Sequence, residues 1–264
     1  MQTDNPPSSV AEPIKFTIAT VTYNATDTIE RTILSVEEQD YPYVEHLIVD
    51  GNSTDTTLEH IHHYQERNSI AKVPHEIVCR TEPDEGLYDA MNKALRMATG
   101  DYILFLNAGD QLNRPTLLSA IAQQIQSKPL PAVVYGHTDI VDDKGIVLGP
   151  RKLTPPEVLT SADFQEGMLV CHQAFFANMA VARKMPYDCR YRFSADFDWC
   201  VRIMKQAEQQ GLKFHNTHLV VSKYLNEGLT TRNHRKSLIE RFRIMTHHYG
   251  LLSTCWHHLW FLFR

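Results

Sequence analysis

Residues 82–110 read EPDEGLYDAMNKALRMATGDYILFLNAGD, and this stretch decides the fold class. Its apolar residues recur at helical spacing over about residues 88–98, and Gly100 then ends the helix that this spacing predicts. Residues 102–106 follow as YILFL, a continuous apolar run that is typical of a strand buried on both faces. A helix that leads directly into such a strand predicts an α/β fold with parallel strands.

The same alternation of strands and helices extends on both sides of this stretch. Upstream, the first helix opens on a pattern at residues 27–30 that resembles a capping box. Downstream, the pattern is looser, and Ser194 is expected to be the N-cap of a long helix. The expected strands are 16–21, 46–49, 76–79 and 132–135, and the further helices are 56–64, 116–126 and 194–209. We therefore expect one mostly parallel sheet with helices on both faces, continued by the second half of the chain.

Composition and charge describe a globular chain. The 264 residues are 43% hydrophobic, which is enough apolar content for a core. A formal net charge of -5 argues against a whole-surface nucleic-acid binder, although residues 232–264 carry six basic residues and one acidic residue. Five cysteines without C-x-x-C spacing favour a reducing compartment over disulfides or a zinc site. No apolar run reaches about 18 residues and residues 1–13 lack the core of a signal peptide, so we expect a cytoplasmic chain without a membrane span.

Polar side chains follow each of the four strands expected in the first half. In a parallel sheet the carboxyl ends of the strands share one edge, where ligands collect. Four aspartates stand there, namely Asp50, Asp55, Asp84 and Asp110. Together they would form an acidic crevice, which Mg²⁺ or Mn²⁺ bound with a diphosphate would neutralise. The alternative is that these aspartates cap helices or shape turns.

Five segments of the chain stand in an order and at spacings that point to one family. They are TIATVTYNATDTIERTILSV (17–36), LIVDGNSTDTT (47–57), the stretch 82–110, CHQAFF (171–176) and SADFDWCVRIMK (194–205). Together they resemble the family-2 inverting glycosyltransferases, and more closely the branch of bacterial capsule, O-antigen and exopolysaccharide assembly. The resemblance covers roughly residues 14–210. It implies a GT-A-type fold that binds a nucleotide-sugar, expected to be UDP-linked, with a divalent metal, and passes the sugar to a hydroxyl with inversion.

The resemblance also implies which side chains contact the donor. The residues after the first two strands would contact the nucleotide, and the aspartate after the second strand its base or ribose. The acid after the third strand would add a further nucleotide contact, and the YDAMN motif would face the diphosphate or the sugar. The substrate-binding residues so implied are Thr22, Asn24, Asp50, Asp84, Asp89 and Asn92.

The family's metal motif, D-x-D, is incomplete in this chain. The matching stretch is NAGD at 107–110, which lacks a carboxylate at both usual positions and leaves Asp110 immediately after them. The resemblance therefore makes Asp110 the expected ligand of Mg²⁺ or Mn²⁺, bound directly or with water-mediated contacts in place of the missing ligands. Weaker metal affinity and metal-independent activity are the alternatives.

An inverting transfer needs one carboxylate to take the acceptor's proton and a cation to stabilise the leaving diphosphate. Asp196 occupies the position of the family's E-D base, although the usual preceding Glu is Ala195 here. The alternative is that Asp196 only favours a helix N-terminus, while Asp198 pairs with Arg202 at i,i+4. His172 matches a histidine of this branch and would bond the donor phosphates or the acceptor, or else be structural.

The C-terminal segment breaks the globular pattern. Arg232, with further basic residues close behind it, would close over the diphosphate as a basic loop, or else belong to a solvated charged face. Over residues 252–263, large apolar residues recur at i, i+4, i+7 and i+11 beside further aromatic residues. This resembles an amphipathic helix in the interface of an anionic membrane leaflet. The alternative is a helix packed on the body of the protein or in a dimer interface.

The expected parts are a disordered lead-in (1–13), a nucleotide-sugar-binding half (14–112), an acceptor-binding half of the same domain (113–231) and a basic and aromatic helical tail (232–264). The predicted function is an inverting glycosyltransferase, peripheral on the inner face of the cytoplasmic membrane, that extends a lipid-linked glycan or oligosaccharide acceptor in surface polysaccharide synthesis. A non-catalytic nucleotide-sugar or glycan-binding relative is the alternative, because the metal motif is incomplete. A nucleotidyltransferase is disfavoured, since no glycine-rich loop with a basic residue follows the first strand.

Overall fold

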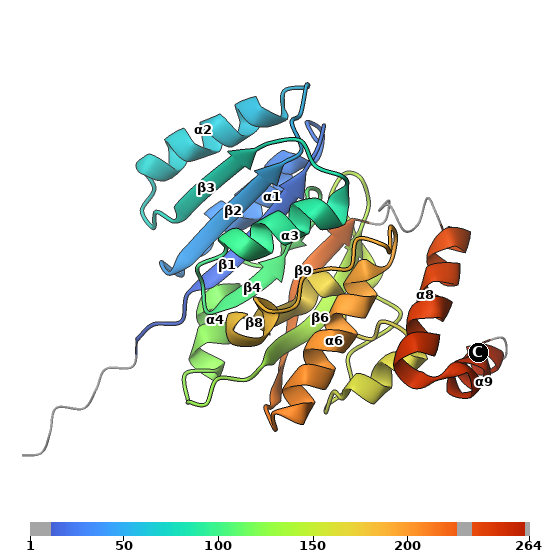
Figure 1. Ribbon diagram of the computed structural model, residues 1–264. Helices are drawn as coiled ribbons and strands as arrows, with labels where there is room; N and C mark the ends of the chain where they lie inside the picture. The colour runs from blue at the N-terminus through green and yellow to red at the C-terminus, as the bar shows by residue number, and fades with distance from the viewer. Residues whose placement is uncertain (1–11, 226–233, 262–264) are drawn as a thin grey trace, which may run out of the picture.

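A mixed sheet runs through the molecule and receives strands from both halves of the sequence (Figure 1). The computed structural model describes residues 12–225 and 234–261. In this part of the chain nine strands join one sheet, in the order β3-β2-β1-β4-β8-β6-β9-β5, and β7 pairs with β6. The second half of the chain therefore continues the sheet of the first half, as the sequence predicts.

The first half of the sheet is parallel. β1 lies between β2 and β4, and β2 pairs with β3 on its other side. All seven residues of β1 and of β2 are buried, as expected for strands covered by helices on both faces. Their carboxyl ends share one edge of the sheet, so the loops that follow them lie side by side. The bounds are Phe16–Thr22 (β1), Val44–Asp50 (β2), Glu76–Thr81 (β3) and Tyr102–Phe105 (β4).

The second half adds strands of both directions. β8 pairs antiparallel with β4 and with β6, whereas β6 and β9 are parallel to each other. β5 is short and pairs antiparallel with β9, which brings the segment after β4 next to the end of β9. The bounds are Gln111–Leu112 (β5), Val133–Val141 (β6), Val147–Pro150 (β7), Phe175–Asn178 (β8) and Phe214–Leu225 (β9).

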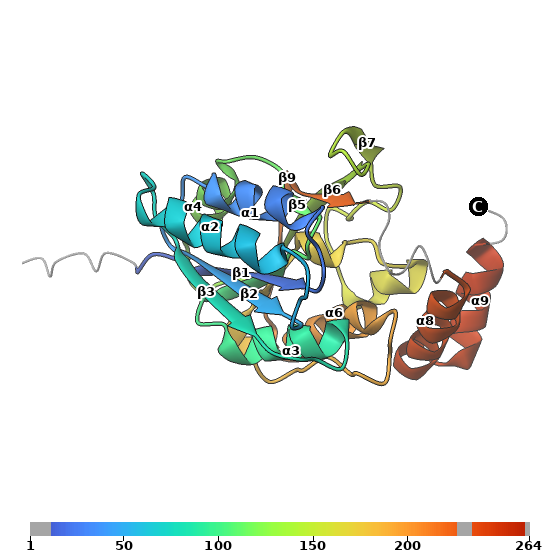
Figure 2. The ribbon, with the colours of Figure 1, turned by 90° about the horizontal axis from the view of Figure 1, so that it is seen from above.

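Helices cover both faces of the sheet, as the sequence predicts (Figure 2). β1 demonstrates the two faces: Phe16 and Ile18 pack in one cluster with α4, whereas Ala19 and Val21 pack in another with α3 and α6. Helices α1 and α2 lie on the same face as α4 and share a cluster of their own over β2. The bounds are Ile29–Glu37 (α1), Thr57–Ser69 (α2), Leu87–Met97 (α3), Leu117–Gln124 (α4), Met179–Ala182 (α5) and Ala195–Gln209 (α6), with 3₁₀ turns at Ser161–Glu166 (η1) and His172–Ala174 (η2).

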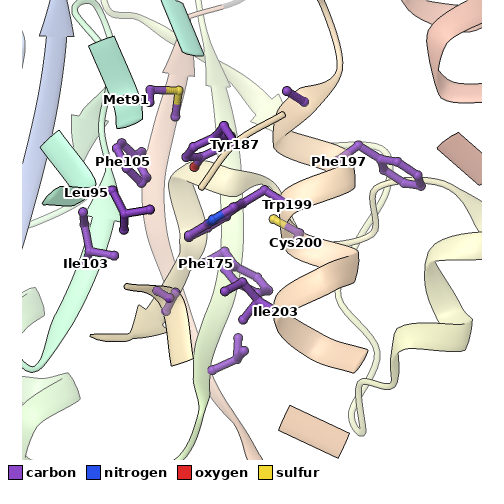
Figure 3. Packing of buried hydrophobic residues seen from close by; sticks show 14 of the residues in the cluster. Met91, Leu95, Ile103, Phe105, Phe175, Tyr187, Phe197, Trp199, Cys200 and Ile203 are labelled. Carbon is purple, nitrogen blue, oxygen red and sulfur yellow. The ribbon is translucent and has the colours of Figure 1, made fainter. Parts of the chain in front are cut away.

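The face under α3 and α6 has an aromatic core (Figure 3). Tyr187 stacks on Trp199 with ring centroids 4.8 Å apart, and Phe105 meets these rings edge-on at 5.3 and 5.8 Å. The indole N–H of Trp199 donates to the carbonyl of Met185 at 2.7 Å. Removing a buried ring of this size costs about 3–5 kcal/mol. The core therefore fixes the first turns of α6 against the sheet.

Neither of the two helix starts singled out in the sequence has a side-chain capping bond, although Ser194 is the N-cap residue of α6 as expected. The N-cap of α1 is Thr28, and its side chain makes no capping hydrogen bond, because its hydroxyl instead donates to Ala25 O at 3.4 Å. Ser194 is the N-cap of α6, but its side chain also makes no capping bond. Its hydroxyl instead pairs with the Ser237 hydroxyl at 2.9 Å, so a tertiary contact replaces the local one.

Two helices follow β9 in the described chain, α8 (His234–Tyr249) and α9 (Leu251–Phe261). They lie together at one end of the molecule, beyond α6 (Figure 1). Gly250 joins them with φ of 85°, a conformation that favours glycine. The helical tail expected from the sequence is therefore present. Within residues 12–225 and 234–261, no helix has the length and apolar character needed to cross a membrane.

Helix α8 is anchored on α6 by charged side chains. Asp198 is buried and accepts from Arg202 Nε at 2.7 Å, which confirms the predicted i,i+4 pair. The other oxygen of Asp198 lies 2.8 Å from His248 Nε2. Lys205 Nζ donates to the backbone carbonyl of His248 at 2.6 Å. These contacts hold the end of α8 against the middle of α6.

Candidate active site

The loops after β1 and β2 are joined by hydrogen bonds at the carboxyl edge of the sheet. Thr22 and Asp50 are register partners at the ends of these strands. The Asp50 carboxylate is buried and accepts from the backbone amide of Ser53 at 3.0 Å. Asn24 has a positive φ of 47°, and its amide oxygen accepts from the Thr54 amide at 2.9 Å. The structure therefore brings Thr22, Asn24 and Asp50 together, as expected.

Asp84 joins the same edge from the loop after β3. Its carboxylate accepts from the Gly86 amide at 2.8 Å, and a Cβ on Gly51 would lie only 2.5 Å from Asp84 Oδ2. Glycine at position 51 leaves the space that the Asp84 carboxylate occupies. Asp89, in the first turn of α3, accepts from the Glu85 amide at 3.2 Å and so remains close to this loop.

Asn92 is placed differently from the other expected substrate contacts. It is buried, and its amide group pairs with the backbone of Tyr187, accepting from the nitrogen at 2.7 Å and donating to the carbonyl at 3.0 Å. Both polar atoms of Asn92 are thus used to hold the chain that carries Tyr187. Arg232, the remaining expected substrate contact, lies outside the described residues.

Asp55 belongs to a turn. Its side chain is exposed and accepts from the Thr57 amide at 3.0 Å and from the Thr26 amide at 3.2 Å. The hydrogen bond from the Thr57 hydroxyl is the main cause that lowers the pKa of this carboxyl. These contacts match the turn-shaping alternative for Asp55.

Asp196 lies at the centre of a polar cluster. It is the second residue of α6, and its side chain is 14% exposed. The Tyr88 hydroxyl donates to Oδ1 at 3.1 Å, and His172 Nδ1 lies 3.1 Å from Oδ2. The structure therefore brings two of the residues singled out by the sequence, Asp196 and His172, into direct contact.

The cluster keeps the Asp196 carboxylate charged. Burial alone would raise the pKa of Asp196, but the hydrogen bond and charge of His172, followed by the charge of Arg241, outweigh it and hold this pKa below its ordinary value. Burial raises the pKa of Tyr88 well above its usual range, and the Asp196 charge adds to this. Tyr88 therefore remains a hydrogen-bond donor, and Asp196 remains an ionised acceptor.

Tyr88 is a site residue that the sequence reasoning missed. It stands directly before Asp89 in the motif quoted for donor contacts, where the sequence indicated only a helix. Its partner Asp196 is 108 residues away in sequence, so no local pattern signals the contact.

His172 connects the cluster to the loop after β4. Its Nε2 lies 3.5 Å from Asn107 Nδ2, while its Nδ1 contacts Asp196. The amide oxygen of Asn107 is buried and has no hydrogen-bond partner among the described residues. The first position of the NAGD stretch thus lies beside the carboxylate cluster and presents an unused acceptor.

Asp110 faces inward and anchors the end of β9. It is 4% exposed, and its two oxygens accept from the backbone amide of Leu225 at 3.0 Å and from Gln173 Nε2 at 2.8 Å. Burial raises the pKa of Asp110 to about 6, although these hydrogen bonds and the charge of His172 act in the opposite direction. Asp110 therefore connects the loop after β4 with the turn η2 and with β9.

Gly109 stands where a D-x-D motif has its second aspartate, and its backbone is unfavourable for one. Its φ is 103°, and a Cβ at this position would lie 2.9 Å from Leu225 Cδ2. A carboxylate at position 109 would need both a strained backbone and a displaced Leu225.

The residues present do not fit a protein-built metal centre. In the part of the chain that the structure describes, no three His, Cys, Asp or Glu side chains are grouped so that they could hold a metal ion. Asp110, the expected ligand, already accepts hydrogen bonds with both oxygens. Metal binding by Asp110 remains a prediction.

Helix α8 helps to position Asp196 through the segment that leads into α6. The Glu240 carboxylate accepts three backbone amides in the segment that leads into α6, from Arg192 at 2.9 Å, Phe193 at 2.7 Å and Ser194 at 3.1 Å. Three donors on one carboxylate fix the start of α6, two residues before Asp196. No sequence pattern indicated this role for Glu240.

Comparison with known proteins gives one family. The sequence model described as "Glycosyl transferase family 2" matches residues 17–185. A "PGL/p-HBAD biosynthesis glycosyltransferase" from Mycobacterium bovis is 27% identical over 245 residues, which are 88% of this chain and 85% of that protein. The Escherichia coli "UDP-Glc:alpha-D-GlcNAc-diphosphoundecaprenol beta-1,3-glucosyltransferase WfaP" is 26% identical over 226 residues, or 84% of this chain and 82% of the other.

Solved structures share the fold. Residues 1–349 of S. aureus TarS in complex with UDP superpose with a TM-score of 0.65 at 17% identity, covering 88% of this chain. This chain spans 64% of that TarS chain, less than two thirds of its length. The mannosyltransferase PcManGT from Pyrobaculum calidifontis, in complex with GDP-Man and Mn²⁺, gives a TM-score of 0.63 at 18% identity, covering 94% of this chain and 70% of the other.

Proposed function

The chain belongs to glycosyl transferase family 2 and is a glycosyltransferase, and we propose that it moves a sugar with inversion from a UDP-sugar to a hydroxyl of a lipid-linked or oligosaccharide acceptor in surface polysaccharide synthesis. The observation that carries this proposal is the Asp196 carboxylate, held between Tyr88 and His172 beside the loop after β4. It supplies the one base that an inverting transfer requires.

The transfer is an in-line displacement at the anomeric carbon. Asp196 takes the proton of the acceptor hydroxyl as the new glycosidic bond forms and the bond to the UDP oxygen breaks. The low pKa of Asp196 keeps it ionised at neutral pH, and its contacts with Tyr88 and His172 hold the carboxylate in one orientation. A fixed base close to the reacting hydroxyl contributes about 10²–10⁴-fold to such a step.

The donor lies on the loops of the parallel half. Thr22, Asn24, Asp50 and Asp84 line the common edge and take the nucleotide, while Asp89, in the first turn of α3, takes the diphosphate or the sugar. The UDP moiety is supported by the name of the E. coli relative, which uses UDP-Glc, and by UDP in the TarS structure.

Mg²⁺ or Mn²⁺ takes part in no step of this proposal. A related fold binds Mn²⁺ with GDP-Man, and Asp110 would be the protein ligand if this chain binds an ion. Its two oxygens already accept hydrogen bonds in the described structure, so no step is assigned to an ion there. The proton transfer is assigned to Asp196 on the contacts of that residue.

We propose that the C-terminal helices contact a membrane and so place the acceptor side of the site next to it. Leu252 and Trp256 are 87% and 71% exposed, and Leu251 and Leu259 are also exposed. Exposed apolar side chains on a helix that follows a basic segment suit the headgroup layer of an anionic leaflet. The E. coli relative acts on a diphosphoundecaprenol-linked sugar, which supports a lipid-linked acceptor and a peripheral position on the inner face of the cytoplasmic membrane.

The donor is tested by nucleotide binding. UDP, GDP, CMP and dTDP are added singly, each with and without Mn²⁺, and the melting temperature is measured, because a ligand of the native state raises it. We expect a shift with UDP. Sugar transfer to a prenyl-diphosphate-linked acceptor is then followed with the matching UDP-sugars. Nucleotide binding without transfer, across a broad set of donors and acceptors, would favour the non-catalytic alternative.

The membrane contact is tested by flotation with anionic liposomes. We expect the double variant Leu252→Glu, Trp256→Glu to float much less than the wild type, since two exposed apolar anchors become charged. Ile70→Glu is the matched control, because Ile70 is 88% exposed and belongs to the far end of α2. Equal flotation of the double variant and the control would disprove the tail contact.

A further inference from the structure

Arg241 is a half-buried cation whose charge acts on the reacting carboxylate. It lies on α8 directly after Glu240, and its guanidinium stands 5.6 Å from the centre of the Phe197 ring. Its Nε is buried and has no hydrogen-bond partner in the described ranges 12–225 and 234–261. Burial lowers the pKa of Arg241, and the charge of Asp196 is the main cause that opposes this. A buried cation is costly unless an anion pairs with it.

The position of Arg241 is fixed by its neighbours. Glu240 holds the three amides that lead into α6, and the Ser194 and Ser237 hydroxyls are 2.9 Å apart. Phe197 directly follows Asp196 and projects from α6 on the side away from Trp199 (Figure 3). Arg241 packs over this ring, so its guanidinium is set relative to Asp196 and is not a free surface charge.

A second arginine shares this neighbourhood. Arg151 follows β7, and its Nη1 donates to the carbonyls of Leu153 at 2.9 Å and Leu169 at 3.4 Å. Its charge is close enough to lower the pKa of Arg241. The nearby carboxylate, Asp196, is already contacted by Tyr88 and His172. The charge of Asp196 acts on Arg241, while the hydrogen bonds of Arg151 in the described residues go to backbone carbonyls, so the two cations accommodate a further anion.

We propose that Arg241, assisted by Arg151, binds the diphosphate group of a lipid-linked acceptor. This inference rests on the proposed function and deepens it. Guanidinium groups bind phosphate oxygens with strong, charge-assisted hydrogen bonds, and the unpartnered Nε supplies such a donor.

The location favours the acceptor over the donor. The residues that take the nucleotide lie on the loops of β1–β3, whereas Arg241 lies on α8, which stands with α9 at one end of the molecule, beyond α6 (Figure 1). Helix α8 also exposes Leu238 and Ile239, three and two residues before Arg241, and α9 exposes Leu251 and Leu252. A helix that carries both a cation and exposed apolar side chains fits a lipid-linked acceptor, in which the diphosphate joins the sugar to the lipid.

Binding is measured with farnesyl diphosphate as the probe, by calorimetry on the full chain with UDP present at saturation. We expect Arg241→Gln to weaken binding at least tenfold, Arg241→Lys and Arg151→Gln to weaken it less, and Arg243→Gln to bind like the wild type. Arg243 is the matched control, because it is an exposed arginine on the same helix. Thermal melting checks each variant, and if Arg241→Gln unfolds, the comparison of Arg241→Lys and Arg151→Gln with the control decides.

Three results would overturn the proposal. The first is a wild type that does not bind farnesyl diphosphate, and the second is variants that all bind it equally. The third is displacement of the probe by UDP together with an equal loss of UDP affinity in Arg241→Gln, which would assign the arginine to the donor.

Transfer assays separate this inference from the proposed function. We expect Arg241→Gln to raise KM about tenfold for a prenyl-diphosphate-linked acceptor and to leave KM for the neutral alkyl glycoside of the same sugar unchanged. An equal effect on both acceptors would contradict the diphosphate contact. A wild type that transfers no sugar would contradict the proposed function, while the calorimetric comparison would still decide whether Arg241 binds the anion.

Discussion

The donor edge and the base cluster are built in opposite ways. At the donor edge, carboxylates accept amides from their own loops: Asp50 from Ser53, and Asp84 from Gly86. In the base cluster, Asp196 receives Tyr88 from 108 residues away, and the amide of Ser194 donates to Glu240, 46 residues further along.

The carboxylates of the donor edge are therefore held mainly by residues close in sequence, whereas Asp196 is held by contacts between helices that are far apart in sequence. A change in one donor loop alters that loop and the neighbouring loop to which it is hydrogen-bonded. A change in the base cluster alters the packing of α3, α6 and α8 together, because each of these helices contributes a contact. Substitutions at the base cluster should therefore affect catalysis and stability at once, in different proportions.

The largest effect is expected at the base itself. Asp196→Asn removes the proton acceptor and should lower kcat by about 10²–10⁴-fold, while UDP binding remains close to that of the wild type. Transfer rates and UDP calorimetry measure the two quantities. Asp188→Asn is the control, since Asp188 lies before α6 and pairs with Arg190. Normal turnover of Asp196→Asn would show that another group is the base.

Glu240 tests whether α8 positions the base. Glu240→Ala leaves three backbone amides without their acceptor, and we expect a loss of about 2 kcal/mol in the free energy of unfolding. We also expect kcat to fall about tenfold with little change in the KM for the donor, because the start of α6 shifts. Denaturant unfolding and steady-state kinetics measure these effects, with the exposed Glu59→Gln as control. Stability loss with an unchanged kcat would restrict Glu240 to a structural role.

His172 sets the acid side of the pH profile. Its hydrogen bond and charge help to hold the pKa of Asp196 low, so His172→Gln should raise that pKa. The base is active when ionised, and the acid limb of kcat/KM should therefore move to higher pH. The profile is measured between pH 4 and 8, with the exposed His63→Gln as control. An unmoved limb in His172→Gln would contradict the assignment.

The smallest effect is expected from substitution of Asp110, and it concerns how the melting temperature depends on pH. Burial raises its folded pKa to about 6, above the model-peptide value of 3.8, so the folded state holds the proton more tightly. The stability that this proton contributes is present below the unfolded pKa and is lost as pH rises through about 6. The melting temperature of the wild type relative to Asp110→Asn should thus fall between pH 4 and 7.5. A constant difference would contradict this pKa.

The parallel half of the fold could be predicted because its signals are local. The strand expected at 16–21 is Phe16–Thr22, and the helix expected at 88–98 is Leu87–Met97. Helix α2 extends to Ser69, five residues past the expected end. The prediction stopped early because the last turns of this helix are polar and show no apolar residues at helical spacing. The sequence did not predict β9, because apolar and polar residues do not alternate regularly along it. In the structure, its pairing with β6 also contains register shifts.

For the candidate site, the sequence indicated individual residues but not which residues contact one another. Asp196 and His172 were singled out separately, and only the fold shows that they touch. Asn92 and Asp110 were expected at a ligand, yet their polar atoms pair with the backbone of Tyr187 and Leu225. Such pairings join segments about a hundred residues apart, and no spacing in a single sequence encodes them.

Gly109 also limits how this sequence can change over time. A return to D-x-D requires an aspartate at position 109, which meets both the positive φ of 103° and the Leu225 side chain 2.9 Å from its Cβ. An aspartate at position 109 therefore strains the backbone whatever residue stands at position 225, and the end of the Leu225 side chain must also move. The effect of a change at position 109 thus depends on the residue at position 225, so the two positions are coupled in any change of this chain toward D-x-D.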